Sequence, residues 1–185
     1  QEFMDAMRQD IAWLGINADE EFIMSDRMDL FFKAGEQLVK GGNAYACFCN
    51  QDVMRDLRFK GVACAHRDVP VAENFKAWQK MLAKGYREGE VSIRFKGDML
   101  SKNGVMRDPV LFRVDYHKHY RTGEKHCVWP LYDIASVVAE EHNGVTHVMR
   151  SAEFVLRAAL HDELRKILSY RPLTIFEFGR FNVIG

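Results

Sequence analysis

The sequence predicts an α/β fold with a compositionally different middle, the arrangement expected when one domain is inserted into another. Residues 1–43 show helical periods, and from 129 onward helical periods alternate with strand-like runs. Between them, residues 90–130 carry short strand-like runs punctuated by glycines. Apolar residues make up 48% of the 185 residues, so a packed core is expected.

The N-terminal part contains two helical patterns before the first strand. Residues 3–14 place apolar side chains at helical spacing, and Gly15 ends this pattern. Ser25 is positioned to cap a second amphipathic helix that ends at Gly41 and Gly42. The pattern then predicts a strand at 45–49 and helices at 51–60 and 72–86.

The remaining elements are expected in the order strand, strand, strand, helix, strand, helix, strand. They span 90–96, 109–116, 125–130, 131–142, 144–151, 153–170 and a strand-rich tail at 174–185. No apolar run is long enough to span a bilayer and no signal peptide opens the chain. We therefore expect a cytoplasmic monomer without a membrane partner.

Three of the four cysteines lie in one short segment with a histidine. Cys47 and Cys49 are two residues apart on a predicted strand, so their sulfurs share a face, and Cys64 and His66 repeat this spacing. Three thiolates and one imidazole form a closed tetrahedral shell, which favours a structural Zn²⁺. The alternative is a set of buried thiols beside a surface histidine. Free thiols and metal ligation both fit a reducing compartment.

A candidate ligand site lies where two predicted strands run into helices. One strand ends at Pro130, just before Tyr132 and Asp133, and another ends at Arg150 and Ser151. Ligands bind at the carboxyl ends of strands in α/β sheets, so these side chains are expected to share a crevice. The arginine fork suits a carboxylate or a phosphate. The alternative is that Asp133 and Ser151 cap helices and that Arg150 lies on the surface.

The segment HKHYRTGEKH at 117–126 is rich in histidine and carries Lys118, Arg121 and Lys125. It is either a solvated hairpin or a cationic edge that faces phosphates. The formal net charge of zero does not decide between them, because a local basic face fits within a neutral total.

Five blocks, in order, resemble the glutamyl/glutaminyl branch of class I aminoacyl-tRNA synthetases, closest to the archaeal glutamyl type. They are DIAWLGI (10–16), SDRMDLFFKAGEQLVKGGNAYACFC (25–49), MRDPVLFRV (106–114), RTGEKHCVWPLYDIASVVAEEHNGVTHVMRSAEF (121–154) and FEFGRFNV (176–183). The resemblance implies a Rossmann-like catalytic domain split by an inserted acceptor-end-binding domain. Residues 1–43 would end its first half, 44–128 would form the insertion with a structural zinc, and 129–185 would begin its second half.

The resemblance also implies roles for single residues. Tyr132 matches the tyrosine that reaches the substrate side chain, and Arg150 matches the arginine that pairs with the γ-carboxylate of glutamate. Glutaminyl enzymes typically lack an arginine at this point. Ser151 matches a hydroxyl residue near the ATP ribose. Asp133 is expected to position the tyrosine, and Ser136 falls where relatives place a polar residue near the substrate.

The two ATP-binding signatures of this family, of the His-Ile-Gly-His and Lys-Met-Ser-Lys-Ser types, do not occur in the sequence. We therefore expect an internal fragment of a glutamate–tRNA ligase, inactive alone. The intact enzyme would use ATP with Mg²⁺, L-glutamate and the acceptor end of tRNA. Two alternatives remain open: a fragment of a glutaminyl-tRNA synthetase, and a non-catalytic RNA-binding module stapled by zinc.

Overall fold

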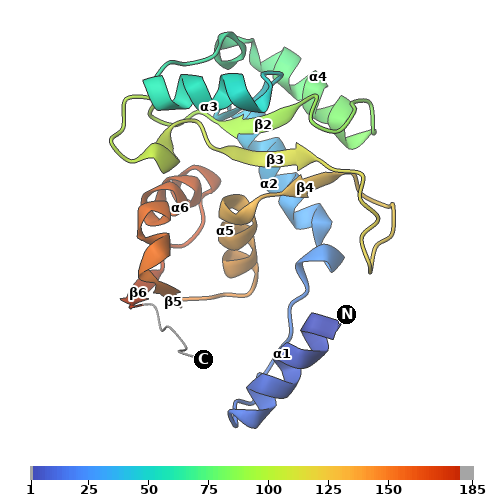
Figure 1. Cartoon of the computed structure of the whole chain (residues 1–185), viewed down its shortest axis with the longest axis vertical. Coiled ribbons are helices and arrows are strands. Elements are labelled where there is room, and N and C mark those ends of the chain that lie inside the picture. The colour runs from blue at the N-terminus through green and yellow to red at the C-terminus, as the bar shows by residue number, and fades with distance from the viewer. Residues whose placement is uncertain (1, 180–185) are drawn as a thin grey trace.

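The molecule is built around a four-stranded antiparallel sheet in the order β1-β2-β3-β4, and a two-stranded parallel sheet of β5 and β6 lies apart from it. The structure is a computed structural model that describes residues 2–179. Figure 1 shows α3 above the larger sheet, α5 and α6 below it, and α1 extending away from the body. The fold is therefore mixed α/β, as the sequence predicts.

The helices and strands follow the predicted order along the chain. The helices, including short 3₁₀ turns labelled η, are α1 (Glu2–Trp13), η1 (Met24–Asp26), α2 (Met28–Lys40), α3 (Gln51–Lys60), η2 (Ala65–Asp68), α4 (Val71–Leu82), η3 (Gly104–Met106), α5 (Tyr132–His142), η4 (Ala152–Phe154) and α6 (Val155–Leu168). The strands are β1 (Ala44–Cys47), β2 (Ser92–Phe95), β3 (Val110–Val114), β4 (Val128–Pro130), β5 (His147–Ser151) and β6 (Thr174–Phe178).

Local sequence explains the best-predicted helix, α3. The Asn50 side chain accepts a hydrogen bond of 2.9 Å from the backbone N–H of Val53, which satisfies one free donor at the helix start. Gly61 ends the helix in the left-handed conformation (φ 70°), which glycine adopts without a steric cost.

One local prediction, the helix cap at Ser25, was wrong. Ser25 lies inside η1, and α2 begins after Arg27 with no side-chain cap. The chain makes a 3₁₀ turn first, so a capping residue at position 25 is too early for the helix. The predicted strand-rich tail is a strand over Thr174–Phe178, and residues 180–185 lie outside the described part of the chain.

The side chains of β1 alternate between two hydrophobic clusters, because successive strand residues point to opposite faces. Ala44 and Ala46 join the main core, which also contains buried residues of α2, α4, α5 and α6. Tyr45 and Cys47 join a small cluster with Cys64. The predicted metal ligands therefore lie apart from the main core. Within residues 2–179, no helix has both the length and the apolar character needed to cross a bilayer.

Candidate functional site

The packed faces of α5 and α6 carry a row of charged side chains. Arg157, His161 and Arg165 recur every four residues on α6, so they lie along one helix face. Asp133 and Glu140 are seven residues apart on α5 and meet this face. His161, Glu140, Arg157 and Arg165 are not among the residues that the sequence predicts for the site. The signal was present as basic residues at helical spacing beside the buried leucines of α6.

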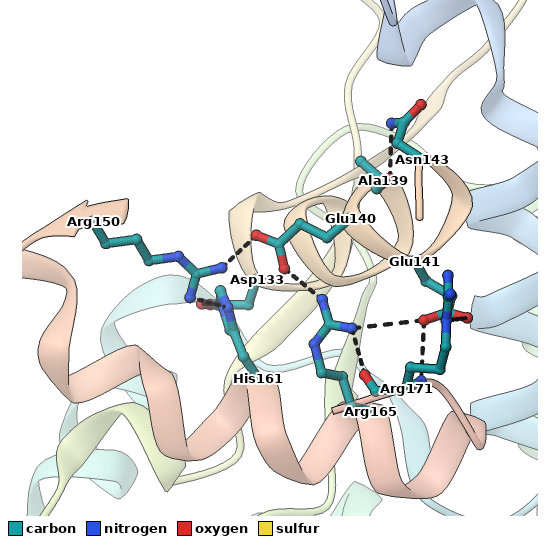
Figure 2. Close-up of polar contacts among 9 residues, drawn as sticks. All are labelled: Asp133, Ala139, Glu140, Glu141, Asn143, Arg150, His161, Arg165 and Arg171. Atoms are coloured by element: carbon teal, nitrogen blue, oxygen red, sulfur yellow. Dashed lines mark hydrogen bonds and ion pairs between the residues drawn. The ribbon is translucent and has the colours of Figure 1, made fainter. Parts of the chain in front are cut away.

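Arg150, at the end of β5, points into this row and is 8% exposed. Its Nη1 lies 2.8 Å from His161 Nδ1, and its Nη2 donates to Glu140 Oε1. The other oxygen of Glu140 accepts a 2.5 Å hydrogen bond from Arg165 (Figure 2). Arg150 is therefore held within the protein, and the alternative that it is a surface residue was wrong.

Asp133 is a buried carboxylate bound by two neighbours on α6. It accepts hydrogen bonds of 2.9 and 2.7 Å from Arg157 Nη1, and His161 Nε2 lies 3.0 Å from Oδ1. Burial raises the pKa of Asp133, but hydrogen bonds from His161 and Arg157, together with the charge of Arg157, outweigh burial and hold this pKa below its usual value. Asp133 is not a helix cap, because Leu131 holds that position without a side-chain cap.

Tyr132 is 41% exposed and stands over the same cluster. Its ring centroid lies 5.8 Å from that of His161 and 5.1 Å from that of Phe154, and the guanidinium of Arg157 lies 5.2 Å from the ring centre. The ring therefore borders both the polar cluster and solvent.

A pocket of about 460 Å³ opens beside Tyr132. In the described part of the chain its walls are Arg58, Val105, Pro109, Val110, Leu131, Tyr132, Asp133 and Arg157. Arg157 lines this pocket, whereas Arg150 is not among its lining residues and bonds to His161.

The fold brings three of the predicted site residues together and leaves Ser136 and Ser151 outside their contacts. Tyr132, Asp133 and Arg150 all meet at His161, although β4 and β5 belong to different sheets. The helices α5 and α6, rather than adjacent parallel strands, make this convergence. Ser136 is half-buried one turn after Tyr132 on α5. The Ser151 hydroxyl donates a 3.2 Å hydrogen bond to Glu153 and does not cap η4.

The four predicted metal ligands form one cluster, with their ligand atoms all within 4.8 Å of one another. The Cys47 and Cys64 sulfurs are 3.8 Å apart, and the Cys49 sulfur lies 3.5 Å from His66 Nδ1. A tetrahedral Zn²⁺ with ordinary bond lengths needs about 3.8 Å between sulfurs and about 3.6 Å between sulfur and nitrogen. The side chains therefore fit zinc with little movement.

Polar groups surround these ligands on the buried side. Arg94 is 1% exposed, and its Nη1 lies 3.7 Å from the Cys47 sulfur and 3.6 Å from the Cys64 sulfur. The buried carboxylate of Asp108 accepts hydrogen bonds from Tyr45 and Arg67. A divalent ion with three thiolates carries a net charge of −1, which a buried guanidinium offsets.

The Cys49 thiol retains its proton at neutral pH when no cation is bound. Burial, followed by the charge and hydrogen bond of Cys47, raises the pKa of Cys49 to about 12. A bound cation favours the thiolate form, so metal binding would release protons from such thiols.

A groove of about 590 Å³ runs from the metal cluster toward the Tyr132 pocket. The two share Arg58, Val110 and Leu131 in their walls. Further charged residues along the groove are Arg55, Glu88, Arg113 and Asp115.

The histidine-rich hairpin is less cationic than its sequence suggests. Arg121 pairs with Asp26 at 2.6 Å, and His117 Nδ1 lies 2.8 Å from Asp115. Lys118 and Lys125 are exposed. The groove is partly neutralised as well, because its Arg113 pairs with Asp115 at 3.0 Å.

Comparisons with known proteins identify the family of the chain and its fold. The family model for the catalytic domain of class I tRNA synthetases (E and Q) matches residues 1–185. Curated glutamate–tRNA ligases of Pyrococcus furiosus and Thermococcus kodakarensis are 46% and 43% identical over 185 residues, which is 99% of this chain and 32% of each relative. The chain thus spans about a third of their length.

A solved structure, a glutamate tRNA ligase from Elizabethkingia meningosepticum in complex with its amino acid, has the same fold. It is similar with a TM-score of 0.64 and 17% identity, over 95% of this chain and 39% of that one. A glutamate-tRNA synthetase from Elizabethkingia anophelis gives the same TM-score at 18% identity.

Proposed function

The chain belongs to the catalytic-domain family of class I glutamyl- and glutaminyl-tRNA synthetases, and from this premise we propose that the full-length protein is a glutamate–tRNA ligase. It would activate L-glutamate with ATP and Mg²⁺ to glutamyl-adenylate, with loss of pyrophosphate, and transfer the glutamyl group to the 3′ end of tRNA. Curated relatives named glutamate–tRNA ligase, at 36–46% identity, support this proposal.

The observation that carries the proposal is the meeting of Tyr132 and Arg150 at His161. A pocket for glutamate needs a contact for the side-chain stem and a positive fork for the γ-carboxylate, and these two residues supply both kinds of group. Arg150 already binds one carboxylate, that of Glu140, in this buried setting. A second carboxylate would use the remaining N–H groups of its guanidinium.

The other site residues would have supporting roles. Asp133 holds Arg157 and His161 beneath Tyr132, so we propose that it positions the tyrosine. Ser136 would lie near the substrate and Ser151 near the ATP ribose. Catalysis by this chemistry depends on positioning and on charge stabilisation at the α-phosphate, with little acid–base work by side chains.

We propose that residues 44–128 form an acceptor-end-binding insertion between catalytic halves at 1–43 and 129–185. The antiparallel sheet is built from residues 44–130, which supports one structural unit, and its last strand, Val128–Pro130, extends two residues past the boundary at 128. The main core includes residues from both sides of each boundary, so the unit would be rigidly joined to the rest. The four free thiols fit a cytoplasmic protein, which we propose acts as a monomer.

Zinc is proposed to stabilise this insertion by binding Cys47, Cys49, Cys64 and His66. Such a site is closed by four protein ligands, so its role would be structural. Elemental analysis of the full-length protein, purified without chelators, is expected to give about one zinc per chain. Less than about half an equivalent would contradict the proposal.

The acceptor end of tRNA is proposed to follow the groove between the metal cluster and Tyr132. Exposed Arg55 on α3 lines this groove, whereas Lys60 on the same helix pairs with Asp56 outside it. Arg55→Ala is expected to weaken tRNA binding and to reduce its salt dependence, and Lys60→Ala is the matched control. Equal effects of the two substitutions would contradict this path.

The test of the proposed function is aminoacylation by the full-length protein with glutamate or glutamine. Wild type is expected to prefer glutamate, and Arg150→Cys is expected to lose that preference, since a neutral side chain no longer matches a carboxylate. Charging of glutamine in preference to glutamate, or no charging at all, would refute it. The 185-residue chain alone is expected to charge no tRNA, because both ATP-binding signatures are absent from its sequence.

A further inference from the structure

His161 is a buried histidine, 1% exposed, with a charged group at each ring nitrogen. Its Nδ1 lies 2.8 Å from Nη1 of Arg150, and its Nε2 lies 3.0 Å from Oδ1 of Asp133. A guanidinium only donates hydrogen bonds, so Nδ1 has to accept and carries no proton. A carboxylate only accepts, so Nε2 has to carry the proton. The neighbours thus select the neutral Nε2–H form of the ring.

We propose that His161 is a positioning residue for substrate recognition: it fixes the orientation of Arg150 and thereby sets the preference for glutamate over glutamine. This inference rests on the proposed function. The His161 ring contacts the ring of Tyr132 and accepts a hydrogen bond from the guanidinium of Arg150. His161 therefore links the two residues. It acts on the substrate only through these two residues.

The geometry explains why the guanidinium of Arg150 needs a second hydrogen-bond partner to fix its orientation. Glu140 binds only Nη2 of Arg150 and is shared with Arg165, so it leaves the guanidinium able to rotate. The bond from Nη1 to His161 fixes the plane of the fork. His161 is itself fixed by Asp133, which Arg157 holds in turn. The chain of bonds runs from the pocket wall to Arg150, as Figure 2 shows for Asp133, His161 and Arg150.

A role in core packing alone predicts something different. The leucines next to His161 on α6 fill the core, and a leucine at position 161 would match the apolar volume but not the hydrogen bonds. Asparagine keeps an acceptor near the position of Nδ1 for Arg150. The two substitutions therefore separate packing from orientation.

The experiment compares His161→Leu and His161→Asn with wild type in the full-length protein. His161→Leu is expected to raise the glutamate KM about 10- to 100-fold, the effect of one hydrogen bond to a charged group, with kcat nearly unchanged and glutamate-over-glutamine preference reduced. His161→Asn is expected to have a glutamate KM and a preference for glutamate over glutamine close to those of wild type. His147→Leu, at an exposed histidine of β5, is the control and is expected to match wild type.

Several outcomes would overturn the inference. They are an unchanged glutamate KM in a folded leucine variant, a loss confined to kcat, or equal behaviour of the two variants. If the leucine variant does not fold, an asparagine variant with a wild-type KM supports the inference, and one with a strongly raised KM and reduced preference overturns it.

A spectroscopic measurement separates this inference from the proposed function. In protein labelled with ¹⁵N-histidine, His161 is expected to show an unprotonated Nδ1 and a protonated Nε2 at neutral pH. The opposite tautomer or a doubly protonated ring would overturn the inference even if glutamate is charged. Wild-type protein that charges no glutamate would instead refute the proposed function, and the substrate role of His161 with it.

Discussion

Glu140→Gln is expected to weaken the packing of α5 on α6 by a predictable amount. The carboxylate of Glu140, 15% exposed, binds the side chains of Arg150 and Arg165, which are 8% and 4% exposed. Breaking a buried ion pair costs about 3–5 kcal/mol when a charge is left alone. Glutamine keeps one acceptor oxygen, and both arginines retain other partners, so we expect about 2–3 kcal/mol.

Hydrogen exchange of α5 and α6 amides in the full-length protein measures this loss locally. A loss of 2–3 kcal/mol corresponds to exchange about 30- to 150-fold faster. The control is Glu36→Gln, which removes a glutamate ion pair with a lysine, Lys40, in which the two side chains are 42% and 54% exposed. We expect the control to cost less than about 0.5 kcal/mol. Equal exchange in the two variants would refute the reasoning that burial sets the magnitude.

Three further predictions concern other parts of the molecule. The pKa of Asp133 in the folded protein is lowered, so its ion pairs stabilise the fold fully above about pH 4 and lose this effect as the pH falls through the lowered pKa. Asp133→Asn removes this titrating carboxylate, so the fall in Tm between about pH 4 and pH 2 should be smaller than in wild type. Cys64→Ser should abolish stoichiometric zinc in elemental analysis, whereas Cys127→Ser, at a buried thiol in the main core, should retain it. Gly97→Ala would place a Cβ 1.9 Å from a main-chain carbonyl oxygen, so we expect thermal unfolding to show a loss of more than about 3 kcal/mol of stability. The control Gly104→Ala meets no atom within 4 Å and should have a Tm near that of wild type. A wild-type Tm for Gly97→Ala would contradict this.

Local patterns predicted most of the secondary structure, because they depend on neighbours along the chain. The helix at 51–60 starts after Asn50 and ends at Gly61, and both signals are read directly from the sequence. The strand reasoning for Cys47 and Cys49 was wrong, because β1 ends at Cys47 and Cys49 lies beyond it, and Cys64 and His66 lie at a 3₁₀ turn; the loop conformation brings the four residues together. The prediction at Ser25 failed because a 3₁₀ turn competes with the helix start, and the choice between them is not a local one.

The cysteine–histidine cluster was predictable only in part. Spacing identified its four ligand residues, and the distances agree with a tetrahedral shell. The buried guanidinium of Arg94 beside the thiols was not predictable, because β2 lies far from Cys47 and Cys64 in sequence. Its position is set by strand pairing between β1 and β2.

The sequence by itself determined the family, the order of elements and the identities of Tyr132, Asp133 and Arg150 as candidate residues. Only the tertiary structure decided that Arg150 is buried against Glu140 and linked to Asp133 through His161. The reason is that a charge is stable in a protein interior only beside a partner of opposite charge or suitable hydrogen bonding. Those partners come from other helices, and the packing of α5 on α6 brings them into reach.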